Sequence, residues 1–368
     1  MKLHFWPNEK QELLLKAVFG QSELAANCLR EWHEKFSLSD LDASTRAILP
    51  FVIQSFPMFK IEPNIFKRYQ QYYQMTWLEN SLKFNKLFEI INLLTQQNIK
   101  ICLLKGAAML LYFYKNMGMR PGMNDIDILI KEEDLPKAID ILKGFGFSPE
   151  DFFEYKGEEL EKKIKAEGFT TQGLHAITYR HENLEIDLHW KLMSLVKEST
   201  FDHLFSEMNE VTLFNNKVYV LSAEAQLFHS CIHGMNQMSE DGKCWWVIDA
   251  LYLIKQHNIN WNKIFLLSQQ YRLVGFIKDF IYYIKTIDSS MVLKEEVNCF
   301  LSRKPDFFQR IFYRMQISRI PLVRKISFYS RIYLNCGAFG GFPKFIRGYF
   351  GISGSLFQFM FKKVWKNI

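Results

Sequence analysis

The sequence predicts an α+β fold in which one strand-bearing segment is flanked by helical regions. Helical spacing of apolar residues runs through residues 8–98, short apolar and alternating runs replace it near residue 99, and helical spacing returns at about Ser222. We therefore divide the chain into an N-terminal helical region (1–98), a core that holds the strands (99–221), a second helical region (222–302) and a basic, aromatic, helical tail (303–368).

The N-terminal region is expected to form several helices that serve packing. Its clearest apolar stripe follows the i, i+3, i+4, i+7 rule of a helix face and consists of Leu87, Ile90, Ile91 and Leu94. Proline starts or ends helices because it lacks the backbone N–H. The prolines that divide this region are Pro50, Pro57 and Pro63.

The core is expected to alternate short strands with short helices. Ile99–Leu104 is apolar enough for a buried strand, whereas Asp125–Ile130 alternates polar and apolar residues, as a strand with one functional face does. The expected elements are strands over 99–104, 125–130, 176–180 and 184–190, helices over 107–115 and 134–143, a loop over 118–124, and a hairpin over 211–221 that turns at Asn215–Asn216. Later helices are expected to break near Gly234, Gly242 and residues 337–343.

Composition and charge limit the class of protein. Of the 368 residues, 48% are hydrophobic and 23% are charged, which excludes a disordered chain. Residues 303–368 hold thirteen lysines and arginines, sixteen aromatic residues and one acid, so this tail carries a net charge of +12 while the whole chain carries +7. A basic tail on an acidic body favours an anionic partner, which is RNA, a membrane surface or a phosphorylated substrate, and the alternative is a solvated helical face.

Cysteine usage and the apolar runs predict a cytoplasmic protein. The six cysteines form no C-x-x-C pair and several lie within apolar runs, which indicates reduced, mostly buried thiols. The first residues lack the apolar stretch of a signal peptide. The uncharged stretch Gly348–Phe361 has 14 residues, which is too short to span a bilayer but compatible with peripheral contact at a membrane surface.

Carboxylates at strand spacing point to a divalent metal. Asp125 and Asp127 are two residues apart on an expected strand, so their side chains point to the same face about 7 Å apart and repel each other. A divalent cation removes that repulsion, and hard oxygen ligands suit Mg²⁺ or Mn²⁺. Alternation on the strand over 184–190 places Asp187 and His189 on the face opposite its apolar residues. Where the two faces are neighbours, three carboxylates converge, as two-metal chemistry at phosphorus requires.

Residues at the first strand-to-helix turn are candidates for contact with a phosphate group. Gly106 allows backbone N–H groups to approach a phosphate, while Lys105 and Arg120 supply positive charge. The sequence contains no G-x-x-x-x-G-K-[ST] motif and no G-x-S-x-G motif, which counts against a P-loop kinase and a serine hydrolase.

A second group of candidates lies in the helical region after the core. His229 and His233 are one helical turn apart and share a face, and Asp249 follows on the next expected helix. Metal ligation is one interpretation. The favoured one is a hydrogen-bonded His–Asp network beside Trp245 and Trp246.

These motifs resemble the uncharacterised bacterial nucleotidyltransferase family, which belongs to the polymerase β nucleotidyltransferase superfamily. The resemblance extends over most of residues 1–270 and rests on Leu103–Ala108 (LLKGAA), Arg120, Asp125–Leu129 (DIDIL) and Glu185–Trp190 (EIDLHW). It implies a small mixed β-sheet flanked by helices. It also implies an enzyme that uses Mg²⁺ (or Mn²⁺) and two-metal chemistry to move a nucleotide from an NTP to a hydroxyl or phosphate acceptor, with a small molecule as the favoured acceptor.

The resemblance also implies roles for individual residues. Asp125 and Asp127 are expected to hold both metal ions, and Asp187 to bind one of them and help to deprotonate the acceptor. The residues expected to bind the nucleotide are Lys105, Gly106 and Arg120. The candidates for the acceptor side are His189, His229, His233 and Asp249.

The chain departs from the superfamily pattern in two respects. Gly106–Ala107 stands where a Gly-Ser pair is usual, and 19 positions separate Gly106 from Asp125, more than in compact members. Abortive-infection toxin nucleotidyltransferases have a similar arrangement, so a toxin-like enzyme that modifies RNA through the tail is one alternative function. A catalytically degenerate scaffold or binding protein is the other. The residues specify neither the identity of the acceptor nor the oligomeric state.

Overall fold

The computed structural model describes residues 6–55, 63–123, 125–151, 156–166, 175–192, 207–236, 244–271, 273–305 and 307–316. Its α-helices are α1 (Glu9–Phe19), α2 (Ser22–Lys35), α3 (Ala43–Arg46), α4 (Leu49–Gln54), α5 (Pro63–Gln96), α6 (Lys105–Ala108), α7 (Leu135–Gly144), α8 (Gly157–Ala166), α10 (Ala223–Asn236), α11 (Trp245–Gln256), α12 (Trp261–Gln270), α13 (Val274–Ile287), α14 (Glu295–Ser302) and α15 (Phe307–Gln316). A π-helix over Met109–Tyr114 continues α6. Short 3₁₀ turns cover Leu38–Asp40, Met117–Met119, Glu132–Asp134 and Ser289–Val292.

Seven strands form one mixed sheet in which β2 and β5 lie near the middle. The strands are β1 (Cys102–Leu103), β2 (Asp125–Leu129), β3 (Ser148–Pro149), β4 (Ala176–His181), β5 (Leu184–His189), β6 (Asn209–Leu213) and β7 (Asn216–Val220). Their order in the sheet is β3-β4-β5-β2-β1-β7-β6. β2 runs parallel to β5 and β1 parallel to β7, whereas the other neighbours are antiparallel. The mixed sheet flanked by helices is therefore confirmed.

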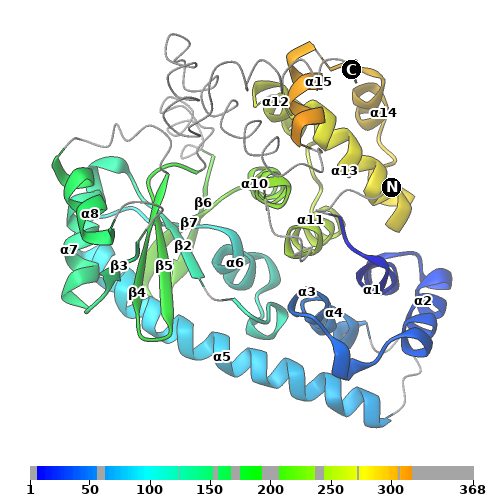
Figure 1. Ribbon diagram of the computed structural model, residues 1–368, viewed down its shortest axis with the longest axis horizontal. Helices are drawn as coiled ribbons and strands as arrows, with labels where there is room; N and C mark the ends of the chain where they lie inside the picture. The colour runs from blue at the N-terminus through cyan, green and yellow to red at the C-terminus, as the bar shows by residue number, and fades with distance from the viewer. Residues whose placement is uncertain are drawn as a thin grey trace, which may run out of the picture.

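The long helix α5 supports both the sheet and the loop that precedes β2. It runs along one edge of the molecule, from the helices at one end to the sheet at the other (Figure 1). It begins at Pro63, whose fixed φ suits the first turn of a helix. From its buried face, the side chain of Asn80 donates hydrogen bonds to the carbonyls of Met117 and Arg120, at 2.7 and 3.0 Å. α5 thereby fixes the loop that carries Arg120.

One hydrophobic core joins the helices to the sheet. Its buried cluster extends along the sequence from Leu14 in α1 to Phe300 in α14 and includes Ile126 and Ile186 from the central strands. α10 packs against α11 and also contacts α6, so helices that follow the sheet in sequence contact its first strand-to-helix turn. The core is thus continuous across residues 98–99 and 221–222, where the sequence pattern changes.

Most expected elements of the core occur where the sequence predicts them. The strand pair β4–β5, the helix α7 and the hairpin β6–β7 are confirmed within two residues. The turn of the hairpin lies at Phe214 and Asn215, both of which have a positive φ, of 46° and 63°. It comes one residue earlier than predicted, because Asn216 already pairs with Leu213.

Two further expectations differ from the structure. The strand expected over 99–104 is reduced to Cys102–Leu103, because only these two residues pair with β2 and β7, and it ends where Lys105 turns the backbone into α6 with a φ of 43°. Gly234, expected to break a helix, lies inside α10. The missing Cβ of Gly234 gives room to Trp246 of α11, whose Cγ lies 2.0 Å from where that Cβ would be.

Several expectations concern residues outside the described part of the chain. These are the RNA or membrane contact of the tail beyond residue 316, Pro57, Gly242, Cys336 and the glycines at 337–343. Within the described part, the five cysteines are free thiols and four of them are buried. None of the helices described there combines the length and apolar character that a membrane crossing requires.

Candidate active site

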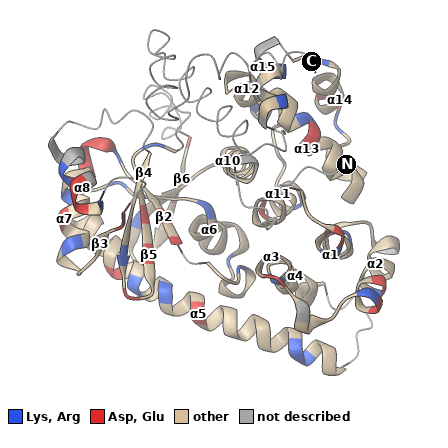
Figure 2. Cartoon of the chain, viewed as in Figure 1, with Lys and Arg blue, Asp and Glu red and all other residues tan. Residues whose placement is uncertain are grey.

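The register of β2 and β5 brings the predicted carboxylates together. These parallel strands pair Asp125 with Glu185, and Asp127 with Asp187. Because alternate residues of a strand share a face, Asp127, Asp187 and His189 lie on the same face of the sheet. Figure 2 shows acidic residues on β2 and β5 near the basic residue of α6.

Asp127 is the buried centre of this group. It is only 2% exposed, and its Oδ1 lies 2.6 Å from Lys105 Nζ and 2.9 Å from His189 Nε2. Burial alone raises the pKa of a carboxyl group. The charge of Lys105 and the hydrogen bond from His189 outweigh burial, so the pKa of Asp127 lies well below its usual range. Asp127 is therefore ionised at neutral pH.

The end of β1 aims Lys105 at Asp127. The N–H of Leu104 donates to the carbonyl of Asp127 at 3.0 Å, which holds the end of β1 beside the middle of β2. Lys105 follows with a φ of 43°, in the left-handed region that residues other than glycine rarely adopt, and such backbone strain is concentrated at functional sites. Burial lowers the pKa of Lys105, but Asp127, with smaller contributions from Asp125 and Asp187, raises it above its usual value. Lys105 therefore stays positively charged.

Asp187 is the more accessible carboxylate of the pair. It is half-buried in β5 and accepts a hydrogen bond from Thr178 Oγ1 of β4 at 2.6 Å. Burial, followed by the charge of Asp127, raises the pKa of Asp187 despite the hydrogen bond from Thr178. A carboxylate with a raised pKa is a stronger proton acceptor, so Asp187 is suited to general-base catalysis.

The donor atoms of this group fit a divalent cation. Asp127, Asp187 and His189 each offer one ligand atom, and these three atoms lie within 4.8 Å of one another. Carboxylate oxygens suit Mg²⁺ and Mn²⁺, whereas an imidazole nitrogen suits later transition metals, so the two aspartates are the donors that fit the expected ions. Asp125 lies two residues before Asp127, at the start of β2, where it is half-buried opposite Glu185 and is not part of this close set.

Arg120 lies against Gly106 and is held by the helix α11. Its Nη1 lies 2.7 and 2.5 Å from the two carboxylate oxygens of Asp249, and its guanidinium lies 4.7 Å from the ring centroid of Trp245. The hydroxyl of Tyr114 also donates to Asp249 Oδ1, at 2.5 Å. A Cβ at Gly106 would lie 2.8 Å from Arg120 Nε, so the glycine makes room for the arginine. The predicted nucleotide-binding Arg120 and the predicted acceptor-side Asp249 therefore form one buried ion pair.

Histidines gather beside the Lys105–Asp127 ion pair. His175 lies just before β4, and its ring centroid is 5.4 Å from that of His189. His229 is buried in α10, the helix that contacts α6. Burial is the main cause that lowers the pKa of both His175 and His229 to about 3, so both rings are neutral at pH 7. Within the described residues, the buried Nδ1 atoms of His189 and His229 have no hydrogen-bond partner.

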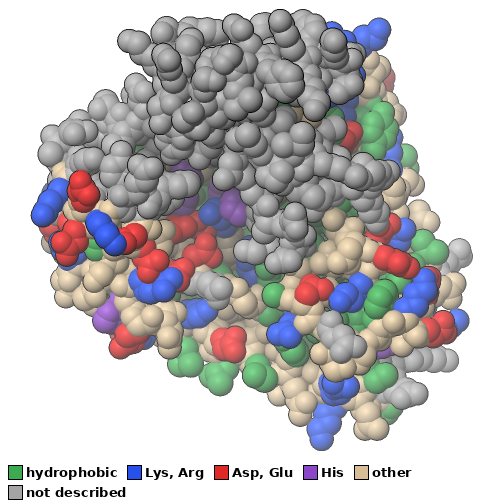
Figure 3. All heavy atoms as spheres, viewed as in Figure 1, with side chains coloured by type: hydrophobic (Ala, Val, Ile, Leu, Met, Phe, Trp, Pro, Cys, Tyr) green, Lys and Arg blue, Asp and Glu red, His purple; other side chains and the backbone are tan. Residues whose placement is uncertain are grey.

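This site contains two residues that the sequence does not predict. His175 and Thr178 belong to no motif, although the hairpin turn between β4 and β5 sets the register that places Thr178 opposite Asp187. Counting back from that turn identifies Thr178, whereas nothing in the sequence identifies His175. His233 lies one turn after His229 on α10, and burial, followed by the charges of Lys105 and His229, lowers its pKa well below the usual value, so it belongs to the same group. In Figure 3, acidic, basic and histidine side chains meet beside the atoms drawn in grey.

Comparisons with known proteins concern the part of the chain that contains this site. A family model described as uncharacterised nucleotidyltransferase matches residues 43–287, which include every site residue named above. Among solved structures, the chain is similar to the antibiotic-resistance factor ANT(2'')-Ia, with 10% identity and a TM-score of 0.36, over 56% of this chain and 97% of that chain. It is also similar to an antigenic nucleotidyltransferase-like protein from Paracoccidioides brasiliensis, with 14% identity and a TM-score of 0.31, over 50% of this chain and 76% of that chain. No curated protein matches the chain.

Proposed function

The chain belongs to the family of uncharacterised nucleotidyltransferases, and from this premise we propose that it moves a nucleotide from an NTP to a hydroxyl or phosphate group of a small-molecule acceptor. The observation that carries the proposal is the pair Asp127 and Asp187, adjacent in the register of two parallel strands, with the ammonium group of Lys105 on Asp127. Two carboxylates on one face can bind a divalent cation, and the ammonium group beside them can neutralise the negative charge of a phosphate. This arrangement therefore suits chemistry at a triphosphate.

The carboxylates are the proposed metal ligands. Asp127 and Asp187 would hold Mg²⁺ or Mn²⁺, and Asp125, two residues along the same strand, would join them as the resemblance implies. A bound divalent cation supplies charge neutralisation at the phosphoryl oxygens and lowers the pKa of an attacking hydroxyl group. The Lys105 ammonium, which lies 2.6 Å from Asp127 Oδ1, competes with a cation at that oxygen.

The side chains have separate roles in the proposed reaction. With a hydroxyl acceptor, Asp187 takes the proton as the acceptor oxygen attacks the α-phosphorus. The new O–P bond forms while the bond from the α-phosphorus to the pyrophosphate oxygen breaks, and pyrophosphate leaves with that electron pair. Lys105 neutralises charge on the phosphates, and His189 orients Asp127 through its 2.9 Å hydrogen bond.

The helices after the core are proposed to complete the site. Asp249 and Trp245 hold the guanidinium of Arg120 beside Gly106, at the turn where the nucleotide phosphates are expected. His175 and His229 are neutral at pH 7, so they offer uncharged hydrogen-bonding groups to the acceptor. The acceptor is therefore proposed to lie between α10 and β5.

Calorimetric titration of each NTP in the presence of Mg²⁺ tests the nucleotide site. We expect the wild type to bind at least one NTP, and Asp127→Asn and Asp187→Asn to weaken that binding by about tenfold or more, because each removes a negative charge from the metal ligands. Asp140→Asn is the matched control, since it changes an exposed carboxylate on α7, and it is expected to bind as the wild type does.

Transfer of a labelled nucleotide to small molecules from a cell extract then tests the reaction. Nucleotide binding that is unchanged in both Asp127→Asn and Asp187→Asn would refute the proposed site. Binding without transfer to any acceptor would favour the binding-protein alternative, and transfer to RNA would favour the toxin-like alternative.

A further inference from the structure

The outer face of α5 carries a line of exposed apolar side chains. Met75, Leu78 and Leu82 are 62%, 55% and 59% exposed, although the opposite face of α5 is buried. Their spacing of three and four residues places them in one line along the helix, which we call the outer stripe. Figure 3 shows hydrophobic side chains along the edge of the molecule that α5 occupies in Figure 1.

Opposite charges end the outer stripe at equal distances from its middle. Helical spacing continues the stripe back through Gln71 to Arg68 and forward through Lys86 to Glu89, and the side chains of Arg68 and Glu89 are exposed. The charge of Lys86 is already balanced by an ion pair with Glu182. The midpoint between Arg68 and Glu89 is also the midpoint between Met75 and Leu82. At 1.5 Å per residue, each charge lies roughly 16 Å from that midpoint. A two-fold rotation about the midpoint therefore exchanges positive for negative ends and leaves the apolar middle in place.

We propose that α5 packs antiparallel against α5 of a second copy of this chain. In this pair Met75 contacts the partner's Leu82, and Arg68 lies opposite the partner subunit's Glu89. Each contact occurs twice because the interface is two-fold symmetric. A parallel pair would place like charges opposite each other at both ends, so the charge pattern specifies the antiparallel direction.

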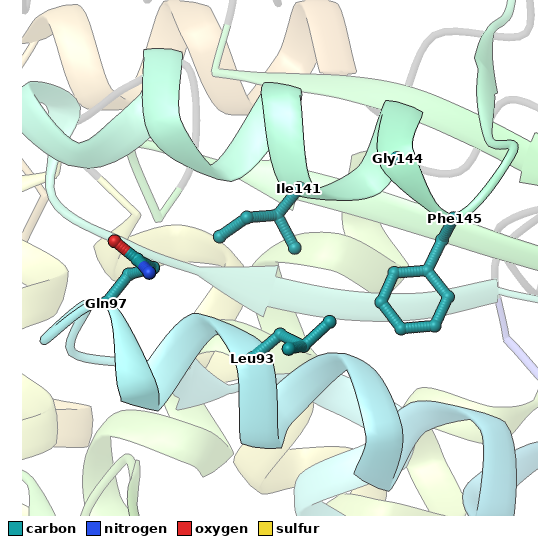
Figure 4. Close-up of a pocket in the computed structure, with 5 residues that line it drawn as sticks. All are labelled: Leu93, Gln97, Ile141, Gly144 and Phe145. Atoms are coloured by element: carbon teal, nitrogen blue, oxygen red, sulfur yellow. The ribbon is translucent and has the colours of Figure 1, made fainter.

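A cavity beyond the end of the outer stripe extends the proposed interface. It lies between α5 and α7, has a volume of about 400 Å³ and is lined by Leu93, Gln97, Ile141, Gly144 and Phe145 (Figure 4). Leu93 continues the helical spacing of the outer stripe by four residues from Glu89. The antiparallel pair brings the first turn of the second α5, which starts at the partner's Pro63, to the level of Leu93. The added apolar contact enlarges the buried area toward the ~800 Å² per subunit of a standard interface.

Sedimentation velocity of the full chain tests the proposal. We expect the wild type to be a dimer at roughly 10–100 µM, the range for an interface of modest size. Leu78→Lys places a charge next to the two-fold axis from both subunits and is expected to raise the dissociation constant about tenfold or more. Leu266→Lys is the matched control, since Leu266 is a 66% exposed leucine on α12. The dissociation constant of this variant is expected to equal that of the wild type.

A charge exchange distinguishes this geometry from any other dimer. Arg68→Glu and Glu89→Arg each place like charges opposite one another and are expected to weaken the dimer, whereas the double variant restores both attractive pairs and wild-type association. All the substituted side chains are exposed, so the variants keep the fold. A monomeric wild type, a dimer that tolerates Leu78→Lys or a double variant that does not recover would each overturn the proposal.

Discussion

At the scale of single residues, the charge of Lys105 keeps the buried Asp127 in its ionised form. Lys105→Met removes that charge and leaves Asp127 with His189 as its remaining contact. We expect the free energy of unfolding, measured by urea denaturation, to fall by about 2 kcal/mol. This is less than for a fully buried pair, because the side chain of Lys105 is 19% exposed.

Two further variants separate this electrostatic effect from general loss of packing. Lys105→Met combined with Asp127→Asn leaves no unpaired buried charge, so the double variant is expected to lose less stability than the sum of the two single losses. Lys131→Met changes an exposed ion pair with Glu133 and is expected to alter stability by less than about 0.5 kcal/mol. Equal losses of the free energy of unfolding for Lys105→Met and Lys131→Met would contradict the proposal that the charge of Lys105 stabilises the ionised Asp127.

His229 predicts how stability changes in mild acid. Its pKa is about 3 in the folded protein, mainly because of burial, against about 6.5 in an unfolded chain. As the pH falls below 6.5, only the unfolded state binds a proton at this residue, so stability decreases. We expect His229→Gln to lose less stability than the wild type between pH 6.5 and pH 4, in urea denaturation at each pH. His181→Gln changes a partly exposed histidine and should retain the wild-type decrease.

Strand alternation accounts for the part of the site that the sequence predicts. The two-residue repeat places Asp187 and His189 on one face of β5, and the parallel register sets Asp127 beside them. Alternation carries no information about contacts between distant elements. The pairing of Lys105 with Asp127 depends on a positive φ at the end of β1, and the place of His175 depends on tertiary packing.

At the scale of elements, Gly234 fixes how closely α10 and α11 approach. A Cβ at Gly234 would lie 2.0 Å from Cγ of Trp246, and this ring is packed against Trp6 and Phe280. Because the ring has no room to move, we expect Gly234→Ala to lower the free energy of unfolding by about 2–3 kcal/mol. Gly144→Ala is the matched control at the end of α7, where an added Cβ meets nothing within 4 Å.

Helix propensity alone favours alanine over glycine at both positions. The change in the free energy of unfolding is therefore expected to have opposite signs in Gly144→Ala and Gly234→Ala. Gly144→Ala is expected to leave stability unchanged or raise it by up to about 1 kcal/mol. Thermal and urea denaturation of both variants measure the difference. A stabilised Gly234→Ala would show that α10 and α11 are not in close contact at this point.

Local sequence signals predict elements best where the chain itself sets the geometry. The hairpins β4–β5 and β6–β7 and the proline-led helix α5 fall into this class, because turns and prolines act on adjacent residues. The short β1 and the uninterrupted α10 are not set by the chain around them. β1 is limited to the two residues that pair with β2 and β7 and ends where Lys105 turns toward Asp127, and Gly234 stays helical because Trp246 fills the space beside it. Both depend on residues distant in sequence.

At the scale of the whole molecule, a buried ion pair connects the sheet unit to the helices that follow it. Arg120 precedes β2, whereas Asp249 lies in α11, and their side chains are 12% and 4% exposed. The hydrophobic core runs through both parts without interruption. Since both polar and apolar contacts cross from one part to the other, we expect the wild type to unfold in one cooperative transition.

Asp249→Asn tests this coupling, because it removes the charge that balances Arg120 while keeping the size of the side chain. We expect the free energy of unfolding to fall by about 3 kcal/mol, as when one partner of a buried pair is lost. Tryptophan fluorescence reports on the side-chain packing around the eight tryptophans, among them Trp190 after β5 and Trp245 in α11, whereas far-ultraviolet circular dichroism reports on the backbone of all helices. With one cooperative unit, both signals move to the same lower urea midpoint in Asp249→Asn, and Asp140→Asn on the surface of α7 leaves the midpoint in place. Separate midpoints for the two signals would instead show that the sheet unit and the later helices unfold independently, so the Arg120–Asp249 pair would connect two domains.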